Sequence, residues 1–488
     1  MAGKSPYETI FKTRHAELKA KDDNWKLVYN AYLGGTYFSE GGYLIKYPKE
    51  SRLSFDTRKK RAVYFNQESP IVDMLSGLLY MNLPTREIPK DLNYIKSEVS
   101  KGKNLDEFMR AVAAHSLMFT CGVLVDGPIF DPGEVKTKKD AAERNLKPLA
   151  SLYLPFRIRD FNINVSDGEL DWVLLDNSYT DHTDPLSNSK EITKYTLWTR
   201  NDFQNFTKEG LQGIPMAEAP VAHGLGMVPF RFVSWRDDNN DFISESICED
   251  IAMISKLIYN NMSYMDEMLA AGTFKMLTYP SKDGSVPEQL TAGGVGALSI
   301  IPYDMASSTI PSFIGHSLTD IEPFIKAITF YMAEVLKKVG LSTDETKEFV
   351  KSGAAKKIDF QKMRALLQSG ALVMGKTEEW ICHTAAKWQG LTEQSVKVDY
   401  TSSFSNEDLQ TEVTMLTELL VHPIKKLNDE VLKLIVKKLL GNYLEPEVIQ
   451  DINKEIESAK NLVDASKNSS KVDLQKEALK IKNASQGA

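Results

Sequence analysis

The segment GALVMGKT, residues 370–377, matches the nucleotide-binding pattern GxxxxGK[ST] letter for letter. In such a loop, backbone N–H groups surround the phosphates, the lysine contacts the β- and γ-phosphates, and the hydroxyl residue holds Mg²⁺. This chemistry requires a buried strand directly before the loop. The preceding residues, FQKMRALLQS, instead have their apolar side chains at helical spacing (Phe360, Met363, Leu366 and Leu367). We therefore expect residues 370–377 to lie inside a helix and to bind no nucleotide.

Few other residues have the spacing that catalysis or metal binding needs. The seven histidines are scattered without an HExxH pattern, and the three cysteines form no CxxC pair (Cys121, Cys248 and Cys382). His115 and His383 fall in helical patterns and are better explained as core or surface residues than as ligands. We expect no catalytic residue, no cofactor and no metal site, and hence a protein that is not an enzyme. The alternative is an ATP-using enzyme that relies on residues 370–377.

Three loops carry weaker signals. Residues 237–241, DDNND, could hold Ca²⁺ through their side-chain oxygens, but a solvated turn is the favoured interpretation. Residues 181–184, DHTD, read as a polar turn. Residues 224–230, GLGMVPF, contain GxG but lack the third glycine and the following helix of a dinucleotide site.

The composition is that of a folded protein. The chain has 488 residues, of which 42% are hydrophobic and 26% charged, enough for about two to four structural units. Its net charge of −7 argues against a protein that coats DNA by neutralising phosphates, but not against a surface past which DNA slides. The first residues lack the apolar stretch of a signal peptide, and we expect no membrane-spanning helix.

The first 242 residues divide into a helical and a strand-rich part. Ser5 and Glu8 have the spacing of a capping box, and aromatic residues at helical spacing are expected in the core (Trp25, Tyr29 and Tyr32). Residues 104–119 read as another helix. Residues 121–236 contain short runs rich in β-branched and aromatic residues, separated by Asp, Asn, Gly and Pro, which predicts an antiparallel sheet region.

Residues 243–271 predict one long helix. Its apolar residues follow each other in steps of 4, 4, 3, 4, 4, 3 and 4, an eleven-residue repeat that keeps them on one face (Ile243, Ile247, Ile251, Ile254, Ile258, Met262, Met265 and Leu269). The other faces carry polar residues (Ser255, Tyr259, Asn260, Ser263 and Asp266). A helix of this span, roughly 40 Å, suits side-by-side packing with copies of itself.

Gly272 is expected to end this helix, and five further segments follow. Residues 272–316 read as a compact insertion that contains strands, and residues 317–339 as a second helix with a heptad repeat and a cap at Ser317 or Thr319. Residues 340–351 are polar. A long helix then runs to about residue 387, with three glycines that could mark kinks (Gly353, Gly370 and Gly375). From Pro423 the chain is again helical and charged, and it ends in a polar tail.

This order resembles that of portal proteins of tailed bacteriophages, namely wing, stem helix, clip, stem helix, tunnel loop, long kinked helix, wing strand and crown. The text SGAAKKIDFQKMRALLQSGALVMGKTEEWICHTAAKW looks like the portal segment that opens the helix after the tunnel loop. VKVDYTSSFSNEDLQTEVTMLTELL resembles the strand and the helix that return toward the crown, and YNAYLGG and LPFRIRDFNIN are also similar. The resemblance covers most of the chain in order.

The resemblance implies an α+β, predominantly helical, ring-forming fold. Its regions would be a wing (1–242), a stem helix (243–271), a clip (272–316), a second stem helix (317–339), a tunnel loop (340–351), a long kinked helix with the return to the wing (352–422), and a crown with a polar tail (423–488).

The resemblance also implies a function. Rings of twelve subunits would occupy the special vertex of a phage capsid and form the channel for DNA packaging and ejection. Partners would be double-stranded DNA, the terminase large subunit, a tail adaptor, and the major capsid and scaffolding proteins, with synthesis in the host bacterial cytoplasm. Another ring-forming virion adaptor is the alternative within this class.

Two sets of site residues follow from the same resemblance. The clip residues expected to dock terminase or adaptor are Tyr279, Lys282, Asp283, Glu288, Tyr303 and Asp304. The residues expected to face DNA in the tunnel are Lys337, Lys338, Thr343, Asp344, Glu345, Lys347 and Lys351. A conduit must hold DNA weakly, and these residues mix both signs of charge. The simpler interpretation of the second set is a solvated helix end and loop.

Overall fold

The fold combines helices and sheets, as predicted. It is known from a computed structural model that describes residues 7–128, 146–182, 189–210, 213–236, 242–273, 276–281, 300–304, 313–314, 321–341, 353–391, 395–400, 415–417, 420, 425–440 and 446–458. The chain divides into two compact units. The first comprises Met1–Leu78 and Asp91–Gln394, and the second comprises Leu79–Lys90 and Ser395–Ala488.

The first part of the larger unit is helical. A 3-10 turn at Ile10–Lys12 precedes helices α1 (Ala16–Leu33), α2 (Gly35–Ser39), α3 (Arg52–Arg61), α4 (Glu68–Leu79), α5 (Tyr94–Ser97) and α6 (Leu105–Met118). The proposed cap at Ser5 lies outside the described residues, and Glu8 forms an ion pair with Lys12 before α1 begins. Of the three aromatic residues expected in the core, Trp25 is fully buried, whereas Tyr29 and Tyr32 are half-buried.

Helix α6 confirms the prediction for residues 104–119, and its start has a local cause. The side chain of Asn104 accepts a hydrogen bond from the backbone N–H of Glu107, and the Glu107 carboxylate accepts one from the N–H of Asn104. This reciprocal pair satisfies two backbone donors that a helix otherwise leaves unpaired. One face of α6 is buried in the core, including Phe108, Met109 and Val112.

The predicted strand-rich region forms two sheets. The larger has the order β10-β8-β7-β5-β4, with β6 paired to β7 and β9 paired to β8, and all pairs are antiparallel. Its strands are β4 (Ile158–Ile163), β5 (Leu170–Asp176), β6 (Tyr179–Asp181), β7 (Lys190–Thr199), β8 (Asp202–Glu209), β9 (Met216–Ala217) and β10 (Val221–Ala222). The smaller sheet has the order β11-β2-β3 and consists of β2 (Cys121–Asp126), β3 (Leu149–Tyr153) and β11 (Phe230–Val233). A short 3-10 turn, Pro155–Arg157, connects the two sheets.

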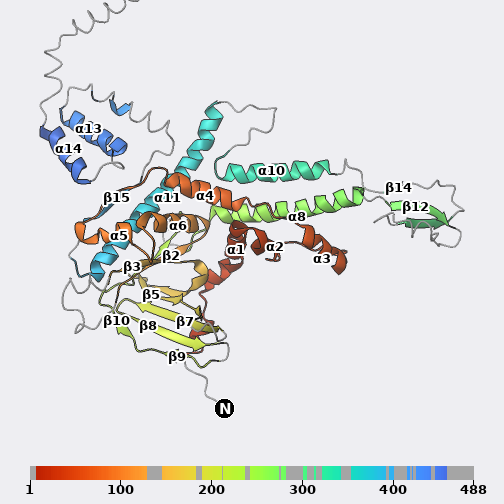
Figure 1. Ribbon diagram of the computed structural model, residues 1–488, viewed down its shortest axis with the longest axis horizontal. Coiled ribbons are helices and arrows are strands. Elements are labelled where there is room, and N and C mark those ends of the chain that lie inside the picture. Colours follow the sequence, from red (N-terminus) through yellow and green to blue (C-terminus); the bar gives the residue numbers. More distant parts are fainter. Residues whose placement is uncertain are drawn as a thin grey trace, which may run out of the picture. The chain divides into compact units, whose positions relative to one another are not determined.

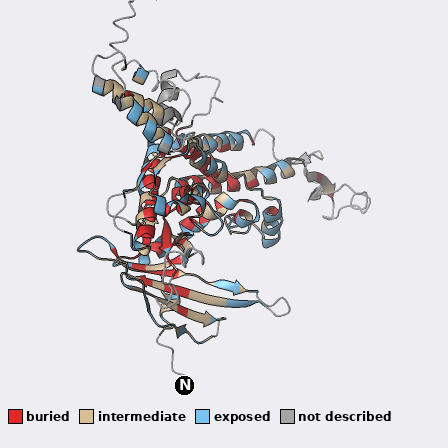
Figure 2. Ribbon diagram, turned by 60° about the vertical axis from the view of Figure 1, so that its left-hand side comes forward, coloured by how far each residue is buried: buried red, intermediate tan, exposed pale blue. Residues whose placement is uncertain are grey.

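The predicted helix–insertion–helix block is present and leads away from these sheets (Figure 1). Helix α8 (Ile247–Thr273) is followed by strands β12 (Met276–Ser281), β13 (Ile300–Asp304) and β14 (Phe313–Ile314), and then by helix α10 (Glu322–Lys338). The three strands form one small sheet, in which β12 lies between a parallel β13 and an antiparallel β14. Figure 2 shows that buried residues are densest near the sheets and become sparser along the two helices.

The bounds of both helices differ from the prediction. Helix α8 begins four residues late because Ser246 acts as its cap, with the hydroxyl accepting a hydrogen bond from the N–H of Cys248 at 3.0 Å, while the N–H of Ser244 donates to the hydroxyl of Thr120. The helix continues through Gly272 instead of ending there. Helix α10 begins at Glu322, and the proposed caps at Ser317 and Thr319 lie outside the described residues.

The polar face predicted for α8 is not a solvent-facing surface. Ser255, Tyr259, Asn260 and Ser263 are all buried, and only Asp266 among the five is exposed. The amide of Asn260 accepts a hydrogen bond from the N–H of Ile45 and donates one to the carbonyl of Tyr43. The N-terminal segments therefore cover the polar side of α8, which hydropathy periodicity assigned to water.

Helix α11 (Gly353–Trp388) is a single helix of 36 residues, as expected for the segment that holds the GxxxxGK[ST] match. It contacts α6, β2 and β11. The smaller unit contains the two-stranded sheet of β1 (Thr85–Glu87) and β15 (Lys397–Asp399) and the helices α13 (Lys425–Leu440) and α14 (Pro446–Ser458). A 3-10 turn, Lys90–Leu92, lies at the boundary of the units. The predicted strand near residue 397 and the helical C-terminal region are thus confirmed within the described residues.

Candidate functional site

The helices α8 and α10 form an antiparallel hairpin whose far end carries the small sheet. The end of α10 lies beside the start of α8, where the amino group of Lys338 is 2.5 Å from a carboxylate oxygen of Asp250. One position of the predicted heptad in α10 is buried at every repeat, with Ile321, Ile328 and Val335 all in the core. These three buried side chains stabilise the hairpin. They confirm the heptad prediction at one of its two apolar positions.

The other heptad position is exposed within α10, although its last member, Val339, is buried directly after the helix. Ile325 is 52% exposed and Met332 is 41% exposed, although both are large apolar residues at the spacing of a packed helix. On α8, Met253 and Leu257 lie one helical turn apart and are also exposed. The hairpin therefore presents apolar side chains that this subunit alone does not cover.

The predicted docking residues of the insertion are only partly within the described structure. Tyr279 lies in β12, and Tyr303 and Asp304 lie in β13. The parallel register pairs Tyr279 with Pro302 and Ser281 with Asp304, so the three residues belong to neighbouring strands of one sheet. The remaining three lie outside the described residues (Lys282, Asp283 and Glu288).

The predicted tunnel residues are also only partly within the described structure. Lys337 forms an ion pair with Glu334 at 3.2 Å, and Lys338 forms the pair with Asp250. Both lysines are at the end of α10, directly before the predicted loop. The other five lie outside the described residues (Thr343, Asp344, Glu345, Lys347 and Lys351).

A buried arginine on the other side of α8 escaped the sequence analysis. Arg58 of α3 is 1% exposed and makes a two-pronged ion pair with Glu50, with N–O distances of 2.9 and 2.8 Å. It also donates to the Ser263 hydroxyl of α8 and to the carbonyl of Ile45, and the pKa of the Glu50 carboxyl is lowered chiefly by its hydrogen bonds from Arg58. Arg58 stands in the run Arg58-Lys59-Lys60-Arg61, and one sequence does not show which member of that run is buried.

The GxxxxGK[ST] match lies inside α11, as expected, and its residues serve packing. A Cβ atom at Gly370 would lie 2.7 Å from the ring of Trp235, so the glycine allows this buried indole to approach the helix. The hydroxyl of Thr377 is buried and donates to the carbonyl of Val373 at 2.7 Å. The phosphate-binding geometry described for such loops needs a strand and a turn here, and a continuous helix provides neither.

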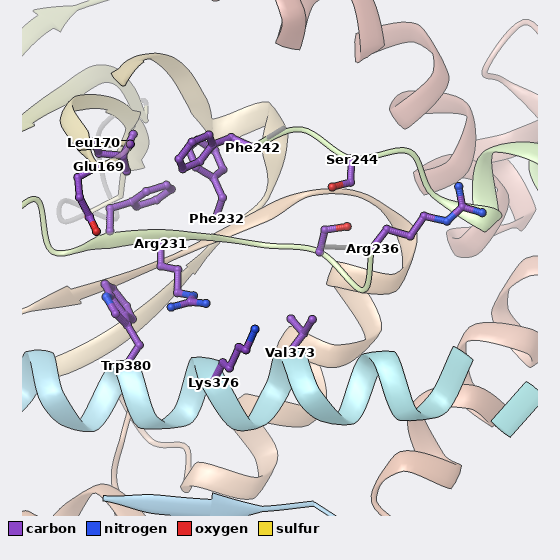
Figure 3. A pocket seen from close by; sticks show the side chains of 13 residues that line it. Glu169, Leu170, Arg231, Phe232, Arg236, Phe242, Ser244, Val373, Lys376 and Trp380 are labelled. Atoms are coloured by element: carbon purple, nitrogen blue, oxygen red, sulfur yellow. The ribbon is translucent and has the colours of Figure 1, made fainter. Parts of the chain in front are cut away.

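Lys376 of the same match lines a pocket of about 380 Å³ between α11 and the strand β11. Figure 3 shows Arg231 of the strand and Lys376 and Trp380 of the helix pointing into the space between these elements. Aromatic rings and hydroxyl groups complete the lining, which also includes Arg236 and Glu169. The pocket is cationic and partly aromatic, and its position on the side of a helix differs from that of a phosphate-binding loop.

A buried carboxyl group lies at the junction of α4 and α8. Glu68 is fully buried, and neither of its carboxyl oxygens has a hydrogen-bond partner among the described residues. Burial raises the pKa of Glu68 to about 8, and the nearby thiol of Cys248 opposes this shift. Burial also raises the pKa of the Cys248 thiol. Glu68 is therefore protonated at neutral pH, when carboxyl groups are ordinarily ionised.

Within the described ranges, His, Cys, Asp and Glu side chains form no group of three that could bind a metal ion. No described helix combines the length and apolar character needed to cross a lipid bilayer. The candidate calcium segment, residues 237–241, lies outside the described residues.

No protein-family description and no curated protein matches the chain. Among solved structures, a chain of the "Neck of empty GTA particle computed with C6 symmetry" has a TM-score of 0.42 and 10% identity, covering 78% of this chain and 92% of its own. A chain of the "Virion of native gene transfer agent (GTA) particle" has the same TM-score and identity and covers 84% of this chain and 93% of its own.

Proposed function

We propose that this chain is the portal subunit of a tailed-phage-like particle, a ring-forming conduit for double-stranded DNA. The observation that carries the proposal is the hairpin of α8 and α10, which holds a small sheet at its far end and leads toward the long helix α11. The order of helix, strand-containing insertion, helix and long helix supports the proposal, because it is the order in which the sequence resembles portal proteins. An adaptor protein of a virion would not need this block.

The exposed apolar residues of the hairpin support assembly into a ring. Ile325 and Met332 stand at heptad positions suited to a partner helix, and both are exposed in the single subunit. In the proposed ring, the hairpin of each subunit packs against that of its neighbour. Twelve copies are expected from the resemblance to portal proteins.

The channel would hold DNA only weakly. Lys337 and Lys338 are each paired with a carboxylate on the hairpin, so their charges are partly neutralised. Weak phosphate contacts let DNA advance without a large cost at each step. The protein would then be no enzyme itself, and a separate ATP-driven motor would move the DNA. Terminase and adaptor would dock at the sheet of β12, β13 and β14.

An ATP-using enzyme has less support than a conduit. Its proposed motif lies within a helix, and the Thr377 hydroxyl that would hold Mg²⁺ is buried and bonded to a carbonyl. Equilibrium dialysis with ATP and Mg²⁺ distinguishes the two functions. Binding that is lost on Lys376→Ala would favour the enzyme, and no binding favours the conduit.

The ring is tested by measuring particle mass and by negative-stain imaging of the purified chain. We expect particles of about twelve times 54.8 kDa with a central hole. The double variant Ile325→Glu/Met332→Glu should give smaller species, because charge would be buried between neighbouring hairpins. The matched control Ile325→Leu/Met332→Leu keeps the apolar surface and should keep the ring. A wild-type chain that stays monomeric in the absence and presence of scaffold would contradict the proposal.

A further inference from the structure

An acidic chain carries a strongly basic segment, which consists of α3 and the residues directly before it. Residues 45–61 contain seven basic residues against two acidic ones, although the whole chain has a net charge of −7. Five of these cations are exposed and form no ion pair among the described residues (Lys46, Lys49, Arg52, Lys59 and Lys60). We refer to these five residues as the α3 platform.

The α3 platform is held in place by contacts of the buried Arg58 and of Tyr47. Arg58 joins α3 to Glu50 and to Ser263 of α8, and its guanidinium lies 5.3 Å from the ring centre of Tyr47. Tyr47 in turn stacks on Tyr264 of α8 at 4.6 Å between ring centres. The segment and the helix thus form one rigid support for the exposed cations, which lowers the entropic cost of binding a partner.

The three platform residues on α3 lie on other faces of this helix than Arg58 and Arg61, which contact α8. Arg61 points to α8, where it pairs with Asp266 and Glu267. Arg52 and Lys59 are seven residues apart and so share one face of the helix, with Lys60 next to it, and all three are exposed. In Figure 1, α3 and α10 flank α8 on different sides, so the platform is separate from the face that leads to the predicted tunnel loop.

We propose that the α3 platform binds the phosphate backbone of double-stranded DNA outside any channel. Four of its five cations are lysines, which are depleted from the cores of protein–protein interfaces but readily contact phosphates as point charges. A single carboxylate, Asp56, is exposed between them. An acidic protein partner, the alternative to DNA, would also contact the exposed side chain of Leu53 beside these cations. This inference does not depend on ring formation.

The test uses relaxed closed-circular duplex DNA, which has no end that could enter a channel. Binding to the full-length chain is measured by fluorescence anisotropy over a range of salt concentrations. Each lost phosphate contact lowers the slope of log K against log[salt] by about 0.9. For Arg52→Gln/Lys59→Gln/Lys60→Gln we therefore expect a slope reduced by about 2 to 3 and at least tenfold weaker binding at low salt.

The matched control is Lys96→Gln/Lys101→Gln/Lys103→Gln, which removes the same charge from three exposed lysines around α5. It should leave the slope within about 0.5 of the wild-type value. Equal effects of the two triple variants would overturn the proposal, since they would reflect net charge alone. It would also be overturned if the platform variant lost binding to poly-glutamate but kept its DNA slope. Unchanged thermal unfolding of both variants excludes misfolding as the cause.

Discussion

The amino group of Lys338 lies 2.5 Å from a carboxylate oxygen of Asp250 and joins the end of α10 to the beginning of α8. The two residues are 88 positions apart in the chain, and the pair marks the base of the hairpin. Its side chains are 42% and 58% exposed, so water and salt screen the attraction. The ion pair is therefore evidence for the antiparallel arrangement of the two helices, but it contributes little to the stability of the hairpin.

A double-mutant cycle with Lys338→Gln and Asp250→Asn should give a coupling energy of about 0.5 kcal/mol or less. The measurement is urea unfolding of the four proteins at low salt and at 1 M NaCl, where the coupling should vanish. A coupling above about 2 kcal/mol that persists in high salt would show that the pair is shielded from water, for example by a neighbouring subunit.

Arg58 should behave in the opposite way, because it is buried. Arg58→Met leaves the Glu50 carboxylate buried without its partner, and the expected loss is about 3 to 5 kcal/mol in the free energy of unfolding. Glu50→Gln/Arg58→Met should recover a large part of that loss, since no unpaired charge remains. Arg58→Lys should also destabilise, because a lysine cannot make the two-pronged pair. If Arg58→Met unfolded like the wild type, the described network would be wrong.

The buried carboxyl group of Glu68 should make the free energy of unfolding depend on pH. Its folded-state pKa of about 8 lies above the ordinary value of 4.5, so the folded state holds a proton that the unfolded state releases. Its contribution to stability is fully present below pH 4.5, falls as the pH rises toward 8, and changes no further above that pH. The expected slope is at most about 1.4 kcal/mol per pH unit.

The variant Glu68→Gln removes this titration and keeps the shape of the side chain. Urea unfolding at pH 5, 6, 7 and 8 should show the wild type losing stability more steeply than the variant. The variant should therefore gain most, relative to the wild type, at pH 8. Parallel curves for the two proteins would contradict the raised pKa.

Two glycines in helices allow a matched comparison. Gly370→Ala should destabilise by about 1 to 3 kcal/mol, because its Cβ would approach the Trp235 ring to 2.7 Å and force the packing to shift. Gly77→Ala in α4 has no atom within 4 Å of the new Cβ and should stabilise by up to about 1 kcal/mol. Thermal unfolding measures both. Stabilisation by both changes would mean that Gly370 is not needed for the contact with Trp235.

Periodicity predicted the elements well, because each element must bury one face regardless of its partner. The steps between apolar residues identified α8, α10 and α11 within a few residues, and the same reasoning placed residues 370–377 in a helix despite their match to a nucleotide-binding loop. The boundary at Ile247 was missed although its cap is local, since Ser246 and Glu249 have capping-box spacing, whereas the bond between Ser244 and Thr120 spans 124 residues of sequence.

The sequence by itself determined the order of helices and strands and the apolar positions of the hairpin, since these depend on local spacing. Only the tertiary structure decided what covers each face. It buried Asn260 and Ser263 of α8 beneath the N-terminal segments, and it paired Lys338 with Asp250. It also decided that Arg58 is buried while its sequence neighbours Lys59 and Lys60 are exposed. The reason is that polar groups become buried where distant partners satisfy their hydrogen bonds, and one sequence does not reveal those partners.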